Sequence, residues 1–184
     1  GVFLIMRGGD EFRGGKVIDA MVSHIDIFPT VCNLIGVEHP TWLQGESMLP
    51  LLRGDTKQIH EEIFAELNYH GGYEPMRAVR TDRWKYIRRF DDREGIVFPN
   101  CGDCPSKDLW LDAGWQSQPR PTEMLYDLIF DPHETNNLVD QPHAQAAYND
   151  MRQHLDQWMH DTDDPLLKGE IPDKLHPWPE APTY

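Results

Sequence analysis

The chain has 184 residues, of which 39% are hydrophobic and 26% charged, and its formal net charge is −14. This is the composition of a folded globular protein with one domain, or with one domain and part of a second, and it excludes a disordered or collagen-like chain. The longest apolar stretch, residues 25–35, is shorter than the roughly 20 residues of a membrane span. The negative charge repels nucleic acid and anionic membranes, so we expect neither as a partner.

The first residues, 1–9, read as an apolar strand followed by glycines. A continuous apolar run is typical of a strand buried on both faces, which needs partner strands in a large sheet. No good partner strand is near it in the sequence. We therefore expect residues 1–55 to be the end of a large α/β domain whose remainder is missing, and the unpaired strand favours homo-oligomer formation.

A helix is predicted from Asp26, as its N-cap, to Gly36, whose freedom to adopt positive φ stops it. Its spacing places an apolar stripe toward a core, formed by Ile27, Val31, Leu34 and Ile35.

Residues 56–165 change to an alternating pattern and form the second unit. Four short strands are predicted, at residues 63–67, 76–80, 84–90 and 124–128, and residues 81–83 join the middle two as a hairpin. A long helix, residues 142–161, then covers one face of the sheet. Its apolar stripe is formed by Ala146, Met151, Leu155, Trp158 and Met159. This is a small α+β subdomain with a four-stranded antiparallel sheet and a packed C-terminal helix. Between its last two strands, residues 95–122 form a packed excursion, and residues 131–138 form a turn closed by Asp and Asn side chains. Residues 166–184 form an extended, proline-rich tail.

No complete active site is visible in the sequence. The nine histidines lack the spacing of a zinc helix, and the pair Cys101 and Cys104 has no second pair and lies in a loop, so neither a zinc site nor a redox site is favoured. No serine has the context of a nucleophile. The acidic run 161–164 is more typical of a solvated helix end than of a calcium loop. We therefore expect no catalytic residue and no metal ligand in this chain.

One basic segment stands out against the acidic background. Residues 77–93 carry seven basic and three acidic residues, so their local charge is +4 while the rest of the chain carries −18. Arginine suits sulfate and carboxylate because its planar fork donates two parallel hydrogen bonds. The alternative is that these side chains make ion pairs and keep the sheet surface soluble, and for any single one of them this is the more probable interpretation.

The loop before this segment, residues 68–75, is dense in hydrogen-bonding groups and is placed where strands commonly carry ligand contacts. We take His70 as the foremost substrate-binding residue, with Glu74 and Arg77 behind it. The alternative is that His70 is an ordinary polar residue of the surface, and the sequence does not decide between the two interpretations.

Four segments in order resemble the C-terminal third of type I, formylglycine-dependent sulfatases: residues 22–30, 43–52, 76–87 and 125–138. Residues 73–79, 131–138 and 158–165 are most similar to the heparan N-sulfatase (sulfamidase) branch. The resemblance implies an alkaline-phosphatase-like α/β fold, of which this chain is the C-terminal part, and hydrolysis of sulfate esters or sulfamates of a sulfated sugar. It also implies a calcium ion in the complete protein, held by residues upstream of Gly1.

The family's nucleophile motif, C-x-P-S-R or its serine variant, does not occur in the chain. We therefore expect the 184 residues alone to be inactive, to need the missing N-terminal catalytic domain as partner, and to contribute recognition of a sulfated carbohydrate. Two alternatives stay open: a phosphodiesterase or phosphonate hydrolase of the same superfamily, and a non-catalytic module that binds sulfated glycan through the basic hairpin.

Overall fold

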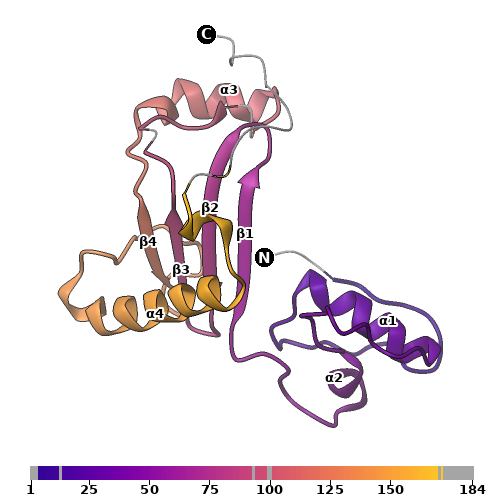
Figure 1. Cartoon of the computed structure of the whole chain (residues 1–184). Helices are drawn as coiled ribbons and strands as arrows, with labels where there is room; N and C mark the ends of the chain where they lie inside the picture. Colours follow the sequence, from indigo (N-terminus) through magenta and orange to yellow (C-terminus); the bar gives the residue numbers. More distant parts are fainter. Residues whose placement is uncertain (1–3, 13, 93, 99–100, 170, 172–184) are drawn as a thin grey trace. The chain divides into compact units, whose positions relative to one another are not determined.

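The computed structural model describes residues 4–12, 14–92, 94–98, 101–169 and 171. They belong to two compact units, Gly1–Ile63 and Phe64–Tyr184 (Figure 1). The boundary predicted after residue 55 lies in the connection that leads to the first strand. No helix among the described residues is long and apolar enough to cross a membrane.

The first unit contains the 3-10 turn η1 (His24–Asp26) and the helices α1 (Ile27–Ile35) and α2 (Leu49–Arg53). Helix α1 ends at Gly36, whose φ of 71° is left-handed, as the sequence predicts. Of the predicted first strand, residues 1–3 lie outside the described residues, and the apolar residues 4–6 form no strand, in contrast to the prediction. A strand needs a neighbour for its backbone N–H and C=O groups, and the described part of this unit contains none.

Asp26 lies at the start of α1 but does not cap it as predicted, since its side chain makes no cap hydrogen bond to that helix. Its fully buried carboxylate instead accepts hydrogen bonds from the backbone N–H of Ser23 at 2.6 Å and of Glu46 at 2.9 Å. The Nε2 atom of His60 lies 2.9 Å from both carboxylate oxygens. One carboxylate thus joins three separate segments of the first unit.

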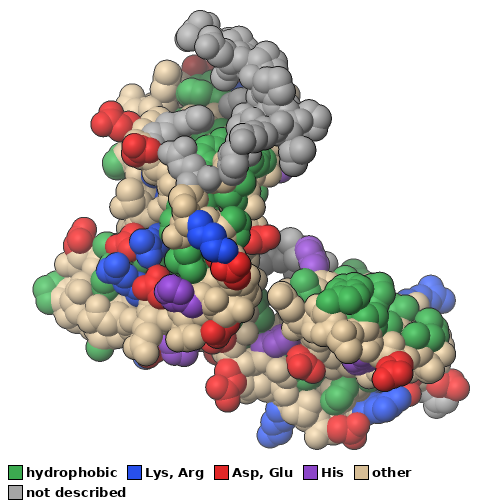
Figure 2. All heavy atoms as spheres, viewed as in Figure 1, with side chains coloured by type: hydrophobic (Ala, Val, Ile, Leu, Met, Phe, Trp, Pro, Cys, Tyr) green, Lys and Arg blue, Asp and Glu red, His purple; other side chains and the backbone are tan. Residues whose placement is uncertain are grey.

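The apolar stripe of α1 is not buried in this unit. Val31, Leu34 and Ile35 are 43%, 37% and 68% exposed, although the sequence places them in a core. Pro29, Thr30 and Cys32 are the residues of the helix that are buried. Figure 2 shows hydrophobic side chains gathered on the surface of this unit. The predicted helix is confirmed, but no described residues cover its apolar face.

The second unit is built on a four-stranded sheet in the order β1-β2-β3-β4. The strands are β1 (Ile63–Tyr69), β2 (Tyr73–Arg80), β3 (Trp84–Arg89) and β4 (Glu123–Asp127). The β2–β3 and β3–β4 pairs are antiparallel, with Ala78 opposite Ile87 and Tyr86 opposite Leu125. The antiparallel sheet and the hairpin that joins its middle strands confirm the fold predicted from the alternating pattern.

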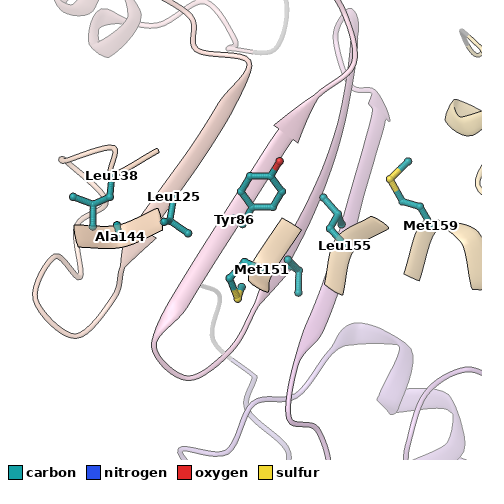
Figure 3. Packing of buried hydrophobic residues seen from close by; sticks show 8 residues of the cluster. Tyr86, Leu125, Leu138, Ala144, Met151, Leu155 and Met159 are labelled. Carbon is teal, nitrogen blue, oxygen red and sulfur yellow. The ribbon is translucent and has the colours of Figure 1, made fainter. Parts of the chain in front are cut away.

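Helix α4 (Gln145–Asp161), preceded by the turn η4 (Pro142–Ala144), packs on one face of this sheet. The core between them is formed by Val79, Tyr86, Leu125, Met151, Leu155 and Met159, each 0% or 1% exposed (Figure 3). Trp158 stacks on Phe64 with 4.9 Å between ring centroids. Ala146, which the sequence places in the stripe, is exposed.

The excursion between β3 and β4 contains helix α3 (Pro105–Asp112) and the turn η3 (Trp115–Ser117). Cys104 is the N-cap of α3, so the cysteine pair precedes a helix rather than lying in a plain loop. Both cysteines are free thiols.

The turn after β4 is closed as predicted. The two oxygens of the Asp131 carboxylate accept hydrogen bonds from the Thr135 hydroxyl at 3.0 Å and from the Asn136 N–H at 2.8 Å. The turn η5 (Pro165–Leu167) follows α4. Apart from residues 166–169 and 171, the proline-rich tail lies outside the described residues.

Candidate functional site

The predicted loop of residues 68–75 is a tight turn, because β1 runs to Tyr69 and β2 begins at Tyr73. His70 lies at the start of the turn, its side chain exposed, and its N–H donates to the carbonyl of Gly72 at 3.2 Å. The rings of Tyr69 and Tyr73 flank the turn with 4.9 Å between centroids. The imidazole of His70 is therefore presented to solvent from a short, ordered support.

The excursion before α3 lies against this turn. A Cβ atom on Gly72 would lie 2.6 Å from the Cγ1 of Val97, which is closer than real Cβ contacts allow. Val97 is itself buried. Glycine at residue 72 therefore permits the close approach of Val97, and a side chain there would force the turn or Val97 to shift.

The β2 side of the turn is held by a cluster of two arginines and two carboxylates. Glu74 forms an ion pair with Arg120 through a short hydrogen bond. Arg120 also donates to Asp91 at 3.2 Å, and Asp91 accepts from Arg89 at 2.8 Å. All four side chains are between 2% and 16% exposed. The carboxylate of Glu74 is thus engaged inside the protein, in contrast to the substrate contact that its loop position predicts.

The β1 side of the turn is held by Arg77, which is fully buried. Its Nε and Nη2 atoms donate to the two carboxylate oxygens of Asp164, at 2.5 and 3.1 Å. Its Nη1 atom donates to the side chain of Asn68 at 2.8 Å, and to the carbonyl oxygens of Leu67 and Met76. The guanidinium is thus enclosed by groups of the protein, and a direct ligand contact of Arg77 stays a prediction.

His70, Glu74 and Arg77 are thus close in the sequence, but their side chains do not point to one common place. Glu74 and Arg77 are three residues apart on β2 and point to opposite faces of the sheet. Each fixes one stem of the turn that presents His70.

Most of the basic side chains in residues 77–93 form ion pairs. The pairs are Arg77 with Asp164, Arg83 with Asp127, Lys85 with Glu134, Arg88 with Asp156 and Arg89 with Asp91, at 2.5 to 3.1 Å. Arg93 lies outside the described residues. The hydrogen bond from Arg83 holds the pKa of the Asp127 carboxyl below its ordinary value. The local excess of positive charge is thus compensated by acids from distant segments, which weakens the case for a heparin-binding surface.

Among the described residues, no group of three or more histidine, cysteine or acidic side chains is arranged to hold a metal ion. We derive no chemical step through a metal from these residues.

Two residues of the site were missed by sequence reasoning. Arg120 follows an irregular, proline-containing segment in which no periodicity marks a function. Asp164 belongs to the acidic run assigned to a solvated helix end, yet it is 3% exposed and pairs with an arginine 87 residues earlier. The one available signal was charge balance, because a buried arginine on β2 requires an acid from elsewhere.

The family model for the C-terminal region of N-sulphoglucosamine sulphohydrolase matches residues 1–103. An ulvan-active sulfatase of Formosa agariphila is 27% identical over 172 residues, which are 91% of this chain and 34% of that protein. Human N-sulphoglucosamine sulphohydrolase is 26% identical over 193 residues, covering 90% of this chain and 38% of the human protein. The chain thus spans little more than a third of the length of these relatives.

A solved structure of a candidate sulfatase from Bacteroides thetaiotaomicron superposes with a TM-score of 0.56 at 27% identity. The match covers 78% of this chain and 25% of that one.

Proposed function

Because the chain belongs to the family of N-sulphoglucosamine sulphohydrolase C-terminal regions, we propose that it is the C-terminal portion of a sulfatase that hydrolyses sulfate esters or sulfamates of a sulfated sugar. The names of the two relatives support the substrate class, since one is active on ulvan and the other on a sulphoglucosamine. In this proposal the nucleophile and the calcium ligands are supplied by the upstream part of the complete protein.

The observation that carries the role of this portion is the placement of His70. An exposed imidazole at a turn whose two stems are held by buried ion pairs is a preorganised hydrogen-bonding group. It can donate to a sugar hydroxyl or to a sulfate oxygen. We assign His70 to substrate binding, and Glu74 and Arg77 to the support of its turn.

The test uses the complete gene product and compares His70→Ala with His133→Ala. His133 is also exposed but lies in the turn after β4, at the other end of the sheet. Loss of one hydrogen bond to the substrate should raise KM for a sulfated monosaccharide about tenfold in His70→Ala and leave kcat nearly unchanged. His133→Ala should behave as the wild type.

A second measurement tests whether the catalytic residues lie in the upstream part of the protein. The 184-residue chain alone should release no sulfate from 4-nitrophenyl sulfate or from N-sulphoglucosamine. Sulfate release by this chain, or an unchanged KM in His70→Ala, overturns the proposal.

A further inference from the structure

We infer that Arg120 is a positioning residue for substrate binding, acting on the His70 turn through Glu74. This inference rests on the proposed function, because it concerns how the same turn is held in its binding geometry. Neither the sequence pattern nor the comparisons single out this residue.

The contacts of Arg120 join three segments. Its Nη2 atom donates to the carboxylate of Glu74, the second residue of β2. Its Nη1 atom donates to the Asp91 carboxylate at 3.2 Å and to the Gly95 carbonyl at 3.3 Å. The Arg120 side chain is 9% exposed, and its bonds to Glu74 and Asp91 are partly buried, whereas the bond to Gly95 is exposed. One guanidinium thus links the start of β2 to the segment that follows β3.

The same residue closes the base of the excursion. Arg89 donates to the backbone carbonyl of Arg120 at 2.8 Å and to that of Pro121 at 3.2 Å. Because Arg120 binds Asp91 and Gly95 at the beginning of the excursion and itself lies at its end, the two ends are held together. Val97, just inside this base, contacts the turn at Gly72. The turn therefore has the closed base of the excursion as its second support.

Arg120 is the residue of this cluster that contacts both Glu74 and the segment after β3. Without Arg120, Glu74 loses this ion pair and its link to Asp91 and Gly95. The first residues of β2 are then held less firmly, and the change passes to His70 four residues away. Arg77 on the opposite face holds the other stem, so the fold itself should survive.

The experiment measures sulfate release by the complete gene product with the variants Arg120→Met, Arg120→Lys and His70→Ala, and with the double variant Arg120→Met/His70→Ala. We expect Arg120→Met to raise KM about fivefold with kcat within about twofold of the wild type, since a misplaced binding group weakens binding more than chemistry. Arg120→Lys, which keeps the charge, should restore part of the loss. The double variant should be no worse than His70→Ala, because Arg120 acts through that side chain.

The matched control is Arg83→Met. Arg83 also pairs with a carboxylate, that of Asp127 at 2.7 Å, but it is 49% exposed and lies at the opposite end of the sheet. Its replacement should leave KM unchanged. If Arg120→Met does not fold, Arg120→Lys and Glu74→Gln carry the same comparison with smaller changes, and unchanged KM in both overturns the inference.

Two results separate this inference from the proposed function. An unchanged KM in His70→Ala overturns both. A raised KM in His70→Ala together with additive losses in the double variant, or with an unchanged KM in Arg120→Met, overturns only the role of Arg120.

Discussion

At the scale of single residues, the His70 turn is governed by two arginines with different surroundings. Arg77 is fully enclosed and uses every guanidinium nitrogen in a hydrogen bond. Arg120 is also shielded, but its partners come from the excursion and from β2. A buried ion pair contributes little net stability when complete and costs much when one partner is removed, because a charge is then left unpaired. Removal of either partner of the Arg77–Asp164 pair should therefore lower the stability of the second unit.

The change Asp164→Asn tests this dependence. It keeps the shape of the side chain but removes the close counter-ion of the buried Arg77 guanidinium and leaves it the longer pair with the exposed Glu66, at 3.7 Å. This should lower the free energy of unfolding by about 3 kcal/mol. The measurement is urea unfolding of the 184-residue chain, followed by the fluorescence of its tryptophans, one of which, Trp158, packs on Phe64 in the second unit.

The matched control for Asp164→Asn is Lys168→Met. Lys168 pairs with Asp163 at 2.6 Å, but both side chains are largely exposed, at 65% and 79%. Exposed pairs contribute about 0 to 1 kcal/mol, so this variant should unfold close to the wild type. Equal effects of the two substitutions would contradict the burial of Arg77.

At the scale of elements, β4 and the turn after it carry three carboxyls whose pKa values are all lowered. Burial raises the pKa of Glu123, but hydrogen bonds from Tyr148 and Tyr86, aided by nearby arginines, outweigh it and hold the pKa below its ordinary value of 4.5. The hydrogen bond from Arg83 lowers the pKa of Asp127, and the backbone N–H groups of Thr135 and Asn136 lower that of Asp131, both from 3.8. All three carboxylates therefore favour the folded state only while they are ionised.

The stability of the second unit should accordingly fall in acid. A carboxyl with a lowered pKa in the folded state gives stability that is complete above its unfolded pKa and is lost as the pH falls through its folded pKa. For Glu123 this decline begins as the pH drops past 4.5 and continues below it. Thermal unfolding at pH 7 to 3 should show a smaller drop for Glu123→Gln than for the wild type, although the variant is less stable at pH 7. A drop of equal size in both would exclude Glu123 as a contributor.

The turn itself can be tested by a pair of substitutions. Gly72→Ala should lower the free energy of unfolding by about 1 to 3 kcal/mol, since the new methyl group overlaps Val97. Val97→Ala removes the overlapped atom but leaves a cavity. If the contact alone excludes a side chain at residue 72, the double variant is more stable than the sum of the two losses predicts, by about 1 kcal/mol. Additive losses in urea unfolding would mean that the contact with Val97 is not what excludes a side chain at residue 72.

The elements were largely predictable from the sequence, whereas their side-chain partners were not. Period-two alternation gave the four strands, Gly36 gave the end of α1, and the resemblance to sulfatases is confirmed by the family match and by the related structure. Local patterns report which face of an element is buried. They do not report that Asp164 meets Arg77 or that Arg120 meets Glu74, because these partners are separated by long stretches of chain.

At the scale of the whole molecule, the two units differ in how well they bury their apolar residues. The second unit encloses a core between α4 and the sheet. The first exposes Phe28, Ile35, Val37 and Trp42 by 51% to 69%. Contiguous exposed apolar surface of this kind marks a contact with another protein surface. We propose that this face packs against the upstream part of the α/β domain in the complete sulfatase.

The isolated 184-residue chain should therefore self-associate through the first unit. Its net charge of −14 opposes association, so added salt, which screens that repulsion, should strengthen it. Light scattering at increasing NaCl concentration measures the effect. The variant Ile35→Lys/Val37→Lys should shift the chain toward the monomer. Because the two lysines reduce the net negative charge, a gain in monomer cannot arise from stronger overall repulsion. It arises from the lost apolar surface and from the charges placed in the contact itself. A monomeric wild-type chain at high salt would contradict the assignment of this face.

In the longer protein the same variant should lower the yield of soluble protein, since it would bury two charges at the proposed contact.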